Sequence, residues 1–460
     1  MEKDNNNKNP QKKFSRRLFL RTIGTTSAGL MVAPYISSSN IFAYGHKSNN
    51  SYLAQVAITQ ATSYDRSLIK QKVTHLFESM GGIGDVVKAG DKVAIKLNLT
   101  GGGAGFYADN MWTHPEVVRA VGELLIDSGV NGNDITIVEA LWSSASFDDF
   151  KDVQNSLGAN MINLNDPAPY SDFVDVSVGP NKFYYDSFLL NKILSDVDVY
   201  VSIPKMKQHF EAGLTCSLKN QIGITPLQLY TIPTDSGRRG ELHSPTHGPS
   251  NEHLPRSVCD LNLARPVNLA VIDGVKNARG GEGSWNPTFQ PTEDNVLLAG
   301  KDPVATDSVA AFFMGIDPEA ETLPLPAGGT CDNYLYLLNQ KGIGTNKMSE
   351  IEIVGDGASL ITSVKPGYDT YIPSEIKLSQ NYPNPFNPET LIRFYLPKTE
   401  FVDLKVYSIT GREIETLING EVPSGFHEVH WTAKNLSSGV YIYKMQANGF
   451  SDAKKMIYQK

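Results

Sequence analysis

The sequence predicts an α/β protein with a mostly parallel sheet and helices on its faces, followed by a small immunoglobulin-like β-sandwich. Two observations support this fold class. Short apolar runs alternate with helical patterns from about Tyr52 to Lys365, which is typical of a parallel sheet covered by helices. After Pro366 only short strands and turn signals remain. A chain of 460 residues also has room for two or three domains.

The amino terminus is expected to be a targeting segment. Ser15 to Arg21 (SRRLFLR) contains paired arginines followed by Leu-Phe-Leu, and a modestly apolar run comes next. This resembles a twin-arginine export signal in which Arg21 replaces the usual lysine, and cleavage after Ala43 would fit it. An ordinary secretory signal with paired arginines is the alternative. Either signal predicts an exported protein.

Composition excludes several classes of function. The net charge is −8, and outside the amino terminus no basic stripe could bind a nucleic-acid backbone, so we expect no nucleic-acid partner. The mature chain has no run of eighteen apolar residues, which predicts no membrane span. Three cysteines without a CxxC pair cannot form a disulfide scaffold, and we expect no iron–sulfur cluster.

The first long region has clear local signals. The segment Pro115 to Gly129 is expected to be a helix, with proline in its first turn, glycine at its end and Val118, Val121 and Leu125 on one face. Asp302 precedes Pro303 and an apolar run, which is typical of a helix N-cap. The expected strands are KVAIKLNLT, DITIVEA, MINLN, VDVYVSIP, VNLAVIDG and NVLLAGKDP.

Polar residues follow each expected strand. In an open parallel sheet, ligands bind at the carboxyl ends of the strands, so these groups are predicted to share one rim. Ordinary loops also follow strands with polar residues, which is the alternative for any single group. The rim residues are Lys96, Asn98, Glu139, Asn165, Asp166, Lys205, Lys207, Asp273, Lys301 and Asp302.

The segment Val201 to Pro226 is the strongest candidate for a ligand site. Lys205, Lys207 and Lys219 lie within fifteen residues of each other, and the part LTCSLKNQIG has helical spacing. A lysine cluster beside a helix start suits a phosphate, sulfate or carboxylate. A solvated basic loop is the alternative. The glycines of LTGGGAG could approach a ligand, but they match no nucleotide-binding pattern.

Histidines gather in the segment ELHSPTHGPSNEHLPRSVCD, which its prolines predict to be a loop. His243, His247 and His253 could bind a divalent metal ion together with carboxylates. Surface histidines without a ligand are the alternative.

Four blocks of this region resemble the family known as domain of unknown function 362, over about residues 54–366. The blocks are THPEVVRAV, IPKMKQHFEAGLTCSLKNQIG, RPVNLAVIDGVKNARGGEG and LLAGKDPVATDSVAAFFMGIDP. The resemblance implies a shared site that includes Lys205, Lys207, His209, Leu218, Lys219, Asn220, Asp273, Gly274, Asp302, Pro303 and Asp307. It implies no particular reaction. Some relatives carry ferredoxin-like cysteine clusters, which this chain lacks.

The carboxy-terminal region is expected to be a delivery module. Val402, Leu404 and Val406 alternate with Asp403 and Lys405, as in a strand with one buried face. The run QNYPNPFNP and the terminal GVYIYKMQANGFSDAKKMIYQK resemble a type IX secretion sorting domain. That resemblance implies passage from the periplasm to the cell surface or the medium through the export machinery. A substrate-binding appendage is the alternative.

These observations predict five segments: a signal peptide over 1–43, a linker over 44–53, an α/β domain over 54–366, a linker over 367–379 and a sorting sandwich over 380–460.

The leading hypothesis is an exported protein that binds or processes an anionic small molecule, with a divalent metal ion as a candidate cofactor. His209 and Lys207 are the candidate catalytic groups, since histidine titrates near neutrality. The substrate-binding candidates are Lys96, Asn98, Lys205, Lys219 and Asn220. The metal-ligand candidates are Asp273, Asp307, His243 and His247. The alternative is a surface protein that binds a ligand or partner without catalysis, and the sequence does not separate the two.

Overall fold

The computed structural model describes residues 53–101, 110–232, 239–243, 249–362, 375–381, 383–434 and 436–459. The twin-arginine segment, the cleavage site after Ala43, most of the LTGGGAG loop and His247 lie outside these residues. None of the helices within these ranges is long and apolar enough to cross a membrane.

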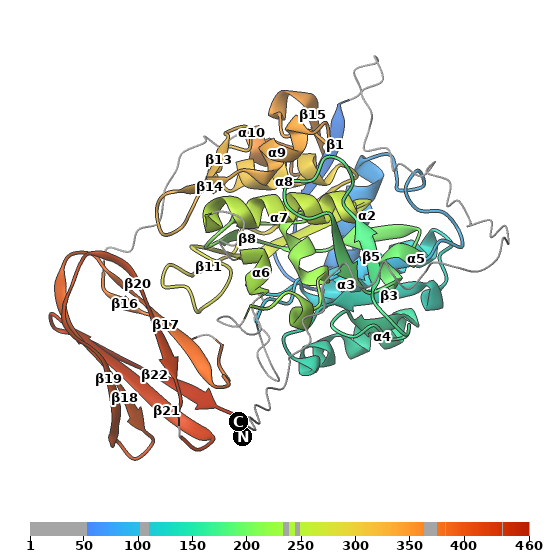
Figure 1. Cartoon of the computed structure of the whole chain (residues 1–460). Coiled ribbons are helices and arrows are strands. Elements are labelled where there is room, and N and C mark those ends of the chain that lie inside the picture. Colours follow the sequence, from blue (N-terminus) through green and yellow to red (C-terminus); the bar gives the residue numbers. More distant parts are fainter. Residues whose placement is uncertain are drawn as a thin grey trace, which may run out of the picture. The chain divides into compact units, whose positions relative to one another are not determined.

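A mixed, mostly parallel sheet forms the centre of the α/β domain (Figure 1). Over the described residues it has eleven strands, with the order β15-β1-β12-β10-β7-β2-β3-β4, while β8, β9 and β11 join through β10. The strands are β1 Ala54–Gln60, β2 Val93–Lys96, β3 Ile135–Glu139, β4 Asn160–Asn163, β7 Val199–Ser202, β8 Lys205–His209, β9 Gly213–Thr215, β10 Leu269–Arg279, β11 Gln290–Thr292, β12 Val296–Gly300 and β15 Ile351–Val354. The predicted α/β fold class is thus confirmed.

Strand direction decides which polar groups share an edge. β4, β3, β2, β7 and β10 run parallel to one another, and β15 runs parallel to β1. β12 is antiparallel to both β1 and β10, with Gly300 opposite Ala270. Its carboxyl end therefore lies at the opposite edge, and the expectation that Lys301 and Asp302 join the rim is wrong. Lys301 instead pairs with Asp85 at 2.7 Å.

Helices cover both faces of the sheet (Figure 1). One face packs against α2 and α3, and the other against α7, α8 and α9, as the two separate apolar clusters show. The helices are α2 Arg66–Ser79, α3 Pro115–Asp127, α4 Lys151–Leu157, α5 Ile193–Asp196, α6 Gly240–His243, α7 Ser250–Ala264, α8 Pro303–Phe313, α9 Tyr334–Gln340 and α10 Ala358–Thr362.

The predicted helix signals are confirmed. α3 starts with proline, and Val118, Val121 and Leu125 on its apolar face are fully buried. Asp302 caps α8, because its side chain accepts hydrogen bonds from the amides of Val304 and Ala305.

Two local predictions in this domain are wrong. The segment LTCSLKNQIG forms β9 and the 3₁₀ helix η3, Lys219–Ile224, rather than an α-helix. The histidine-rich segment contains α6 and α7 rather than a loop throughout, and His253 is buried in α7. Pro255 lies inside α7, where its missing amide hydrogen removes one hydrogen bond of the helix.

Smaller elements complete the domain. These are the pair β5 Val174–Ser177 and β6 Ser187–Leu190, the pair β13 Thr322–Pro324 and β14 Thr330–Asp332, and the 3₁₀ helices η1 Gly132–Asp134, η2 Ser144–Phe150, η4 Leu227–Leu229 and η6 Met348–Glu350.

The carboxy-terminal region is an antiparallel β-sandwich, as predicted. One sheet has the order β16-β17-β20 and the other β19-β18-β21-β22. Val402, Leu404 and Val406 of β18 are buried, and the alternate residues are only half-buried. The strands are β16 Lys377–Leu378, β17 Glu389–Leu396, β18 Glu400–Ser408, β19 Glu413–Val422, β20 Gly425–Thr432, β21 Gly439–Ala447 and β22 Phe450–Tyr458.

Candidate functional site

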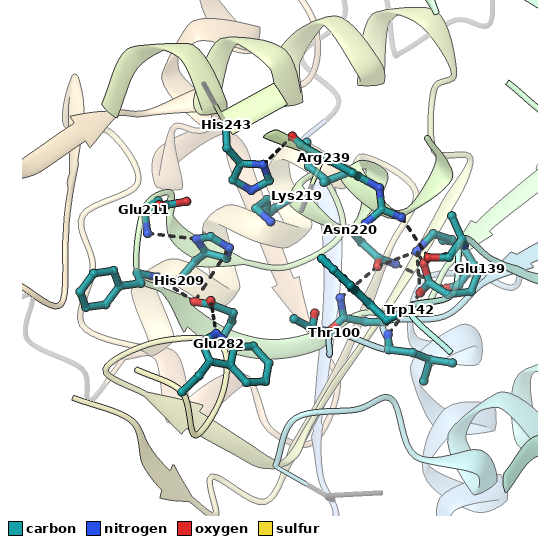
Figure 2. Close-up of a pocket in the computed structure, with 18 of the residues that line it drawn as sticks. Thr100, Glu139, Trp142, His209, Glu211, Lys219, Asn220, Arg239, His243 and Glu282 are labelled. Atoms are coloured by element: carbon teal, nitrogen blue, oxygen red, sulfur yellow. Dashed lines mark hydrogen bonds and ion pairs between the residues drawn. The ribbon is translucent and has the colours of Figure 1, made fainter. Parts of the chain in front are cut away.

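A polar cavity of about 130 Å³ opens where β2, β3 and β8 end and η3 begins (Figure 2). Seven of the residues predicted from the sequence contribute to its wall: Lys96, Asn98, Glu139, His209, Lys219, Asn220 and His243. They come from segments far apart in the chain, so the fold gathers much of the predicted site in one place.

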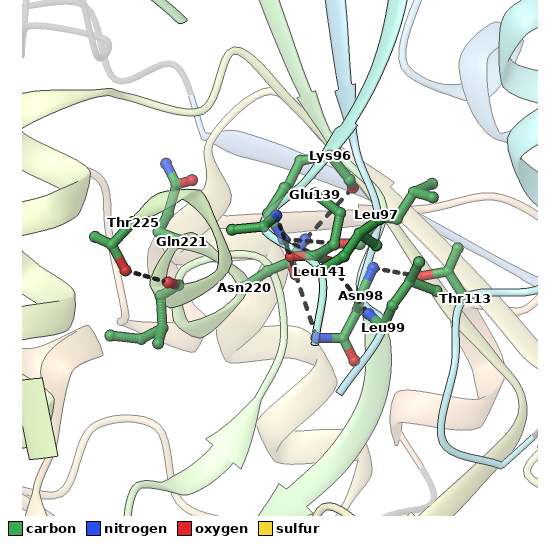
Figure 3. Close-up of polar contacts among 12 residues, drawn as sticks. Lys96, Leu97, Asn98, Leu99, Thr113, Glu139, Leu141, Asn220, Gln221 and Thr225 are labelled. Atoms are coloured by element: carbon green, nitrogen blue, oxygen red, sulfur yellow. Dashed lines mark hydrogen bonds and ion pairs between the residues drawn. The ribbon is translucent and has the colours of Figure 1, made fainter. Parts of the chain in front are cut away.

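A buried ion pair supports the floor of this cavity (Figure 3). Lys96 Nζ lies 2.9 Å from Glu139 and also donates to Leu97 O and to Asn220 Oδ1. Asn98 Nδ2 donates to the same Asn220 oxygen. Because a lysine can only donate, it determines which way the Asn220 amide points, and Asn220 in turn orients Asn98. Burial lowers the pKa of Lys96 to about 8, although Glu139 opposes that change.

Lys219 differs from the other buried lysines. Its side chain is 9% exposed, and it makes no hydrogen bond or ion pair with any residue in the described ranges. Burial lowers the pKa of its ammonium group to about 8, while Glu282 and Glu211 partly offset that effect. A buried cation without a direct counter-ion is costly, and a bound anion would remove that cost.

His209 and Glu282 face each other on one side of the cavity (Figure 2). His209 Nε2 lies 3.9 Å from Glu282 Oε2. Glu282 also accepts hydrogen bonds from the Phe210 amide at 3.1 Å and from Trp285 Nε1 at 2.8 Å. Burial opposes ionisation of Glu282, but His209 and these donors outweigh it and lower its pKa. Burial lowers the pKa of His209 well below its ordinary value. The pair therefore consists of an ionised glutamate and a neutral imidazole.

Arg239 and His243 form another part of the wall. Arg239 is held by its guanidinium, which donates to Thr225 O at 3.0 Å and to Ala140 O at 2.9 Å. His243 Nδ1 lies 3.1 Å from Arg239 O. Burial, followed by the charge of Lys219, lowers the pKa of His243 to about 3, so this ring is neutral as well.

Lys205 is placed away from the cavity wall. Its amine lies 2.6 Å from Asp273 Oδ2 and 2.7 Å from Tyr64 Oη, and Tyr64 donates to the other Asp273 oxygen. Asp273 also accepts from the His114 amide at 3.0 Å. Lys205 and Asp273 are fully buried, so their polar groups already have partners inside the protein.

Lys207 is also fully buried and does not contribute to the cavity wall. Its amine donates to Met111 O at 2.6 Å and Glu282 O at 3.4 Å. Burial lowers its pKa to about 7. Met206, between the two lysines, packs into the cluster with Val56, so Lys205 and Lys207 point to the opposite face of β8.

Two parts of this chain match known protein families. Residues 93–312 match the family described as "Domain of unknown function (DUF362)". This part of the chain is similar to DUF362 domains. A relative, the "Thylakoid-associated protein sll1697" of Synechocystis sp., is 26% identical over 278 residues, which are 59% of this chain and 77% of the relative.

One solved structure also aligns with the chain. The lactate racemase apoprotein from Thermoanaerobacterium thermosaccharolyticum aligns with a TM-score of 0.30 at 13% identity. The alignment covers 55% of this chain and 54% of that one, so this chain spans about half the length of that protein. At this level of similarity it carries no argument about activity.

Residues 380–459 match a "Secretion system C-terminal sorting domain". This module indicates export to the cell surface or the extracellular space, and interaction with the secretion machinery.

The predicted metal ligands are not brought together in the α/β domain. In the part of the chain that the structure describes, no group of three or more His, Cys, Asp or Glu side chains could hold a metal ion. Asp307 accepts hydrogen bonds from the amides of Ser217 and Leu218, both at 2.8 Å, and Asp273 pairs with Lys205. Participation of His247 stays a prediction.

Sequence reasoning missed three charged wall residues of the α/β domain, Glu211, Arg239 and Glu282. Arg239 follows a segment without any regular pattern, and Glu282 lies in the glycine-rich stretch ARGGEGS. The only signal for Glu282 was its presence in a block shared with the family. No local signal pointed to Arg239.

Gly223 provides a test of the cavity floor. A Cβ atom there would collide with Lys96 Nζ and Glu139 Oε1 and would lie 2.9 Å from Lys96 Cε. We expect Gly223→Ala to displace the lysine amine and to lower the free energy of unfolding by about 1–3 kcal/mol, the usual cost of overpacking. Urea denaturation measures this, with Gly84→Ala as control because Gly84 has open space around it. An equal effect in both variants would contradict the tight packing.

Proposed function

We propose that this exported protein binds a small anionic molecule in the cavity of its α/β domain, with Lys219 as the principal contact. The supporting observation is the buried amine of Lys219, which has no hydrogen-bond or ion-pair partner among the described residues. Arg239 contributes a second positive charge to the same cavity wall. Burial lowers the pKa of His209 and of His243, so neither ring adds a positive charge to the wall and the cations Lys219 and Arg239 are left to attract the anion.

These roles differ from those predicted from the sequence. Lys219, together with Arg239, binds the anion. Lys96, Asn98 and Asn220 form the supporting floor. Lys205 and Lys207 act in the structure of the domain, because their amines are occupied elsewhere. A volume of about 130 Å³ suits a small ligand, since a cavity of about 150 Å³ in another protein accommodates benzene.

Lys219→Met tests this function. We expect the affinity for the best ligand among phosphate, acetate and pyruvate to fall about 10- to 100-fold, because a charge-assisted hydrogen bond contributes about 1.5–3 kcal/mol. The melting temperature of the unliganded variant should stay the same or rise, since a buried unpaired charge is removed. Isothermal titration calorimetry and thermal melting measure the two effects.

Lys88→Met is the matched control, since it removes the same charge from an exposed position of the α/β domain. Unchanged affinity in Lys219→Met would overturn the proposal. The alternative, a binding protein without catalysis, uses the same cavity and differs from an enzyme only in turnover. We also propose, from the sequence alone, that the protein reaches the periplasm by the twin-arginine route. The domain boundaries are likewise proposed from the sequence alone.

A further inference from the structure

The two histidines of the cavity are held in opposite tautomers. His209 Nδ1 accepts hydrogen bonds from the amides of Glu211 and Ala212, both at 3.1 Å. A nitrogen that accepts two amide hydrogens carries a lone pair, so the neutral His209 ring bears its hydrogen on Nε2. His209 Nε2 lies 3.9 Å from Glu282 Oε2, which is beyond hydrogen-bond distance, at the cavity wall.

His243 has the reverse arrangement. Its Nδ1 lies 3.1 Å from Arg239 O, and a carbonyl oxygen only accepts, so Nδ1 must carry the hydrogen. The lone pair is then on Nε2, which makes no hydrogen bond with any residue in the described ranges. A backbone carbonyl that orients an imidazole in this way leaves the other nitrogen available for proton transfer.

Figure 2 shows the His243 ring beside Lys219, with His209 also on the wall of this cavity. The cavity wall therefore combines the hydrogen-bond donor His209, the proton acceptor His243 and the cations Lys219 and Arg239. The low pKa of His243 keeps its lone pair free at neutral pH. An anion on Lys219 would screen the positive charge that opposes protonation of the ring.

We infer that the site promotes proton abstraction from carbon in a small 2-oxo carboxylate, with His243 Nε2 as the proton acceptor. This inference rests on the proposed anion-binding function. The carboxylate binds Lys219 and Arg239, and the keto oxygen accepts from His209 Nε2–H. His209 then acts as a neutral electrophile, because its loss of a proton would require an imidazolate.

The step is balanced without a redox partner. The C–H bond next to the carbonyl breaks, its proton moves to His243 Nε2, and the electron pair remains on the ligand as an enolate. His209 Nε2–H and Lys219 stabilise the enolate oxygen. Return of the proton from His243 regenerates the ligand, and in D₂O the returned atom is deuterium.

Pyruvate in D₂O is the probe. Proton NMR of pyruvate with the full mature chain should show faster loss of the methyl signal than in buffer alone. We expect His243→Gln to slow this exchange at least about 100-fold while pyruvate still binds. His209→Gln keeps an N–H donor and should lose less activity, and Lys88→Met should leave exchange unchanged.

The outcomes separate this inference from the anion-binding function. If pyruvate binds through Lys219 without exchange, the proton-transfer inference fails and the anion-binding function stands. If phosphate binds and pyruvate does not, the assignment to 2-oxo acids fails. If no anion binds, or Lys219→Met binds as well as the wild type, the anion-binding function itself fails.

The tautomers can also be measured directly, without an activity assay. Long-range proton–nitrogen NMR of the ¹⁵N-histidine-labelled protein should show hydrogen on Nε2 of His209 and on Nδ1 of His243. Hydrogen on Nε2 of His243 would overturn its role as proton acceptor.

Discussion

Replacing Lys205 with Met is expected to lower the free energy of unfolding by about 3–5 kcal/mol, the usual cost of breaking a buried ion pair. The reason is the carboxylate that remains. Asp273 is fully buried, and without Lys205 it keeps only the Tyr64 hydroxyl and backbone amides as partners. Urea denaturation followed by the helical circular dichroism signal, which arises in the α/β domain, measures the loss.

Lys207→Met is the matched control, because Lys207 lies two residues further along β8 and is equally buried. Its amine contacts two carbonyl oxygens, so its removal leaves no charge behind, and we expect a smaller loss. Adding Asp273→Leu to Lys205→Met should recover part of the lost stability. Equal losses in the two single variants would show that the ion pair is not the cause.

The second large effect is a dependence of stability on pH that comes from Lys207. Burial lowers the pKa of Lys207 to about 7 from its ordinary value of 10.5. Between these values the unfolded chain binds a proton that the folded chain does not, so this residue makes stability rise as pH rises from about 7 to about 10. At about 1.4 kcal/mol for each pH unit, the full difference is about 5 kcal/mol.

The comparison of wild type with Lys207→Met across this pH range isolates the contribution of Lys207. Buried thiols act in the opposite direction, since burial raises the pKa of Cys216. The pH dependence of the wild-type free energy of unfolding is therefore less informative than the difference in this free energy between the wild type and Lys207→Met. We expect the wild type to gain stability relative to Lys207→Met as pH rises. A constant difference would contradict the lowered pKa.

Local signals predicted the elements of the fold well. The first-turn proline and apolar face of α3, the Asp302 cap of α8 and the alternation in β18 are each determined by residues close in sequence. Directions of strands were harder to predict. β12 looks like a parallel strand in its own residues, and only its pairing with β1 and β10 shows that it runs the other way.

The sequence predicted which segments meet at the cavity, but it did not predict the partners of each side chain. The local sequence gives no reason to assign different roles to Lys205, Lys207 and Lys219. Their roles differ because their side chains meet different partners that are distant in the chain. Asp273 and Tyr64 engage the first, whereas no described residue pairs with the amine of the third. Orientation on β8 also matters, because alternate residues of a strand face opposite sides of the sheet. Such partners are fixed only once the sheet has assembled.

The pairing of β1 with β15 affects how the domain folds during its synthesis. Gln55 and Glu352, whose side chains bond at this edge, are 297 positions apart. Tyr64, which holds Lys205 and Asp273, also precedes the matched family segment of residues 93–312. A growing chain on the ribosome therefore holds an unpaired first strand until nearly the whole domain has been synthesised. Contacts between such distant segments slow folding, and until they form the first strand presents unpaired backbone groups.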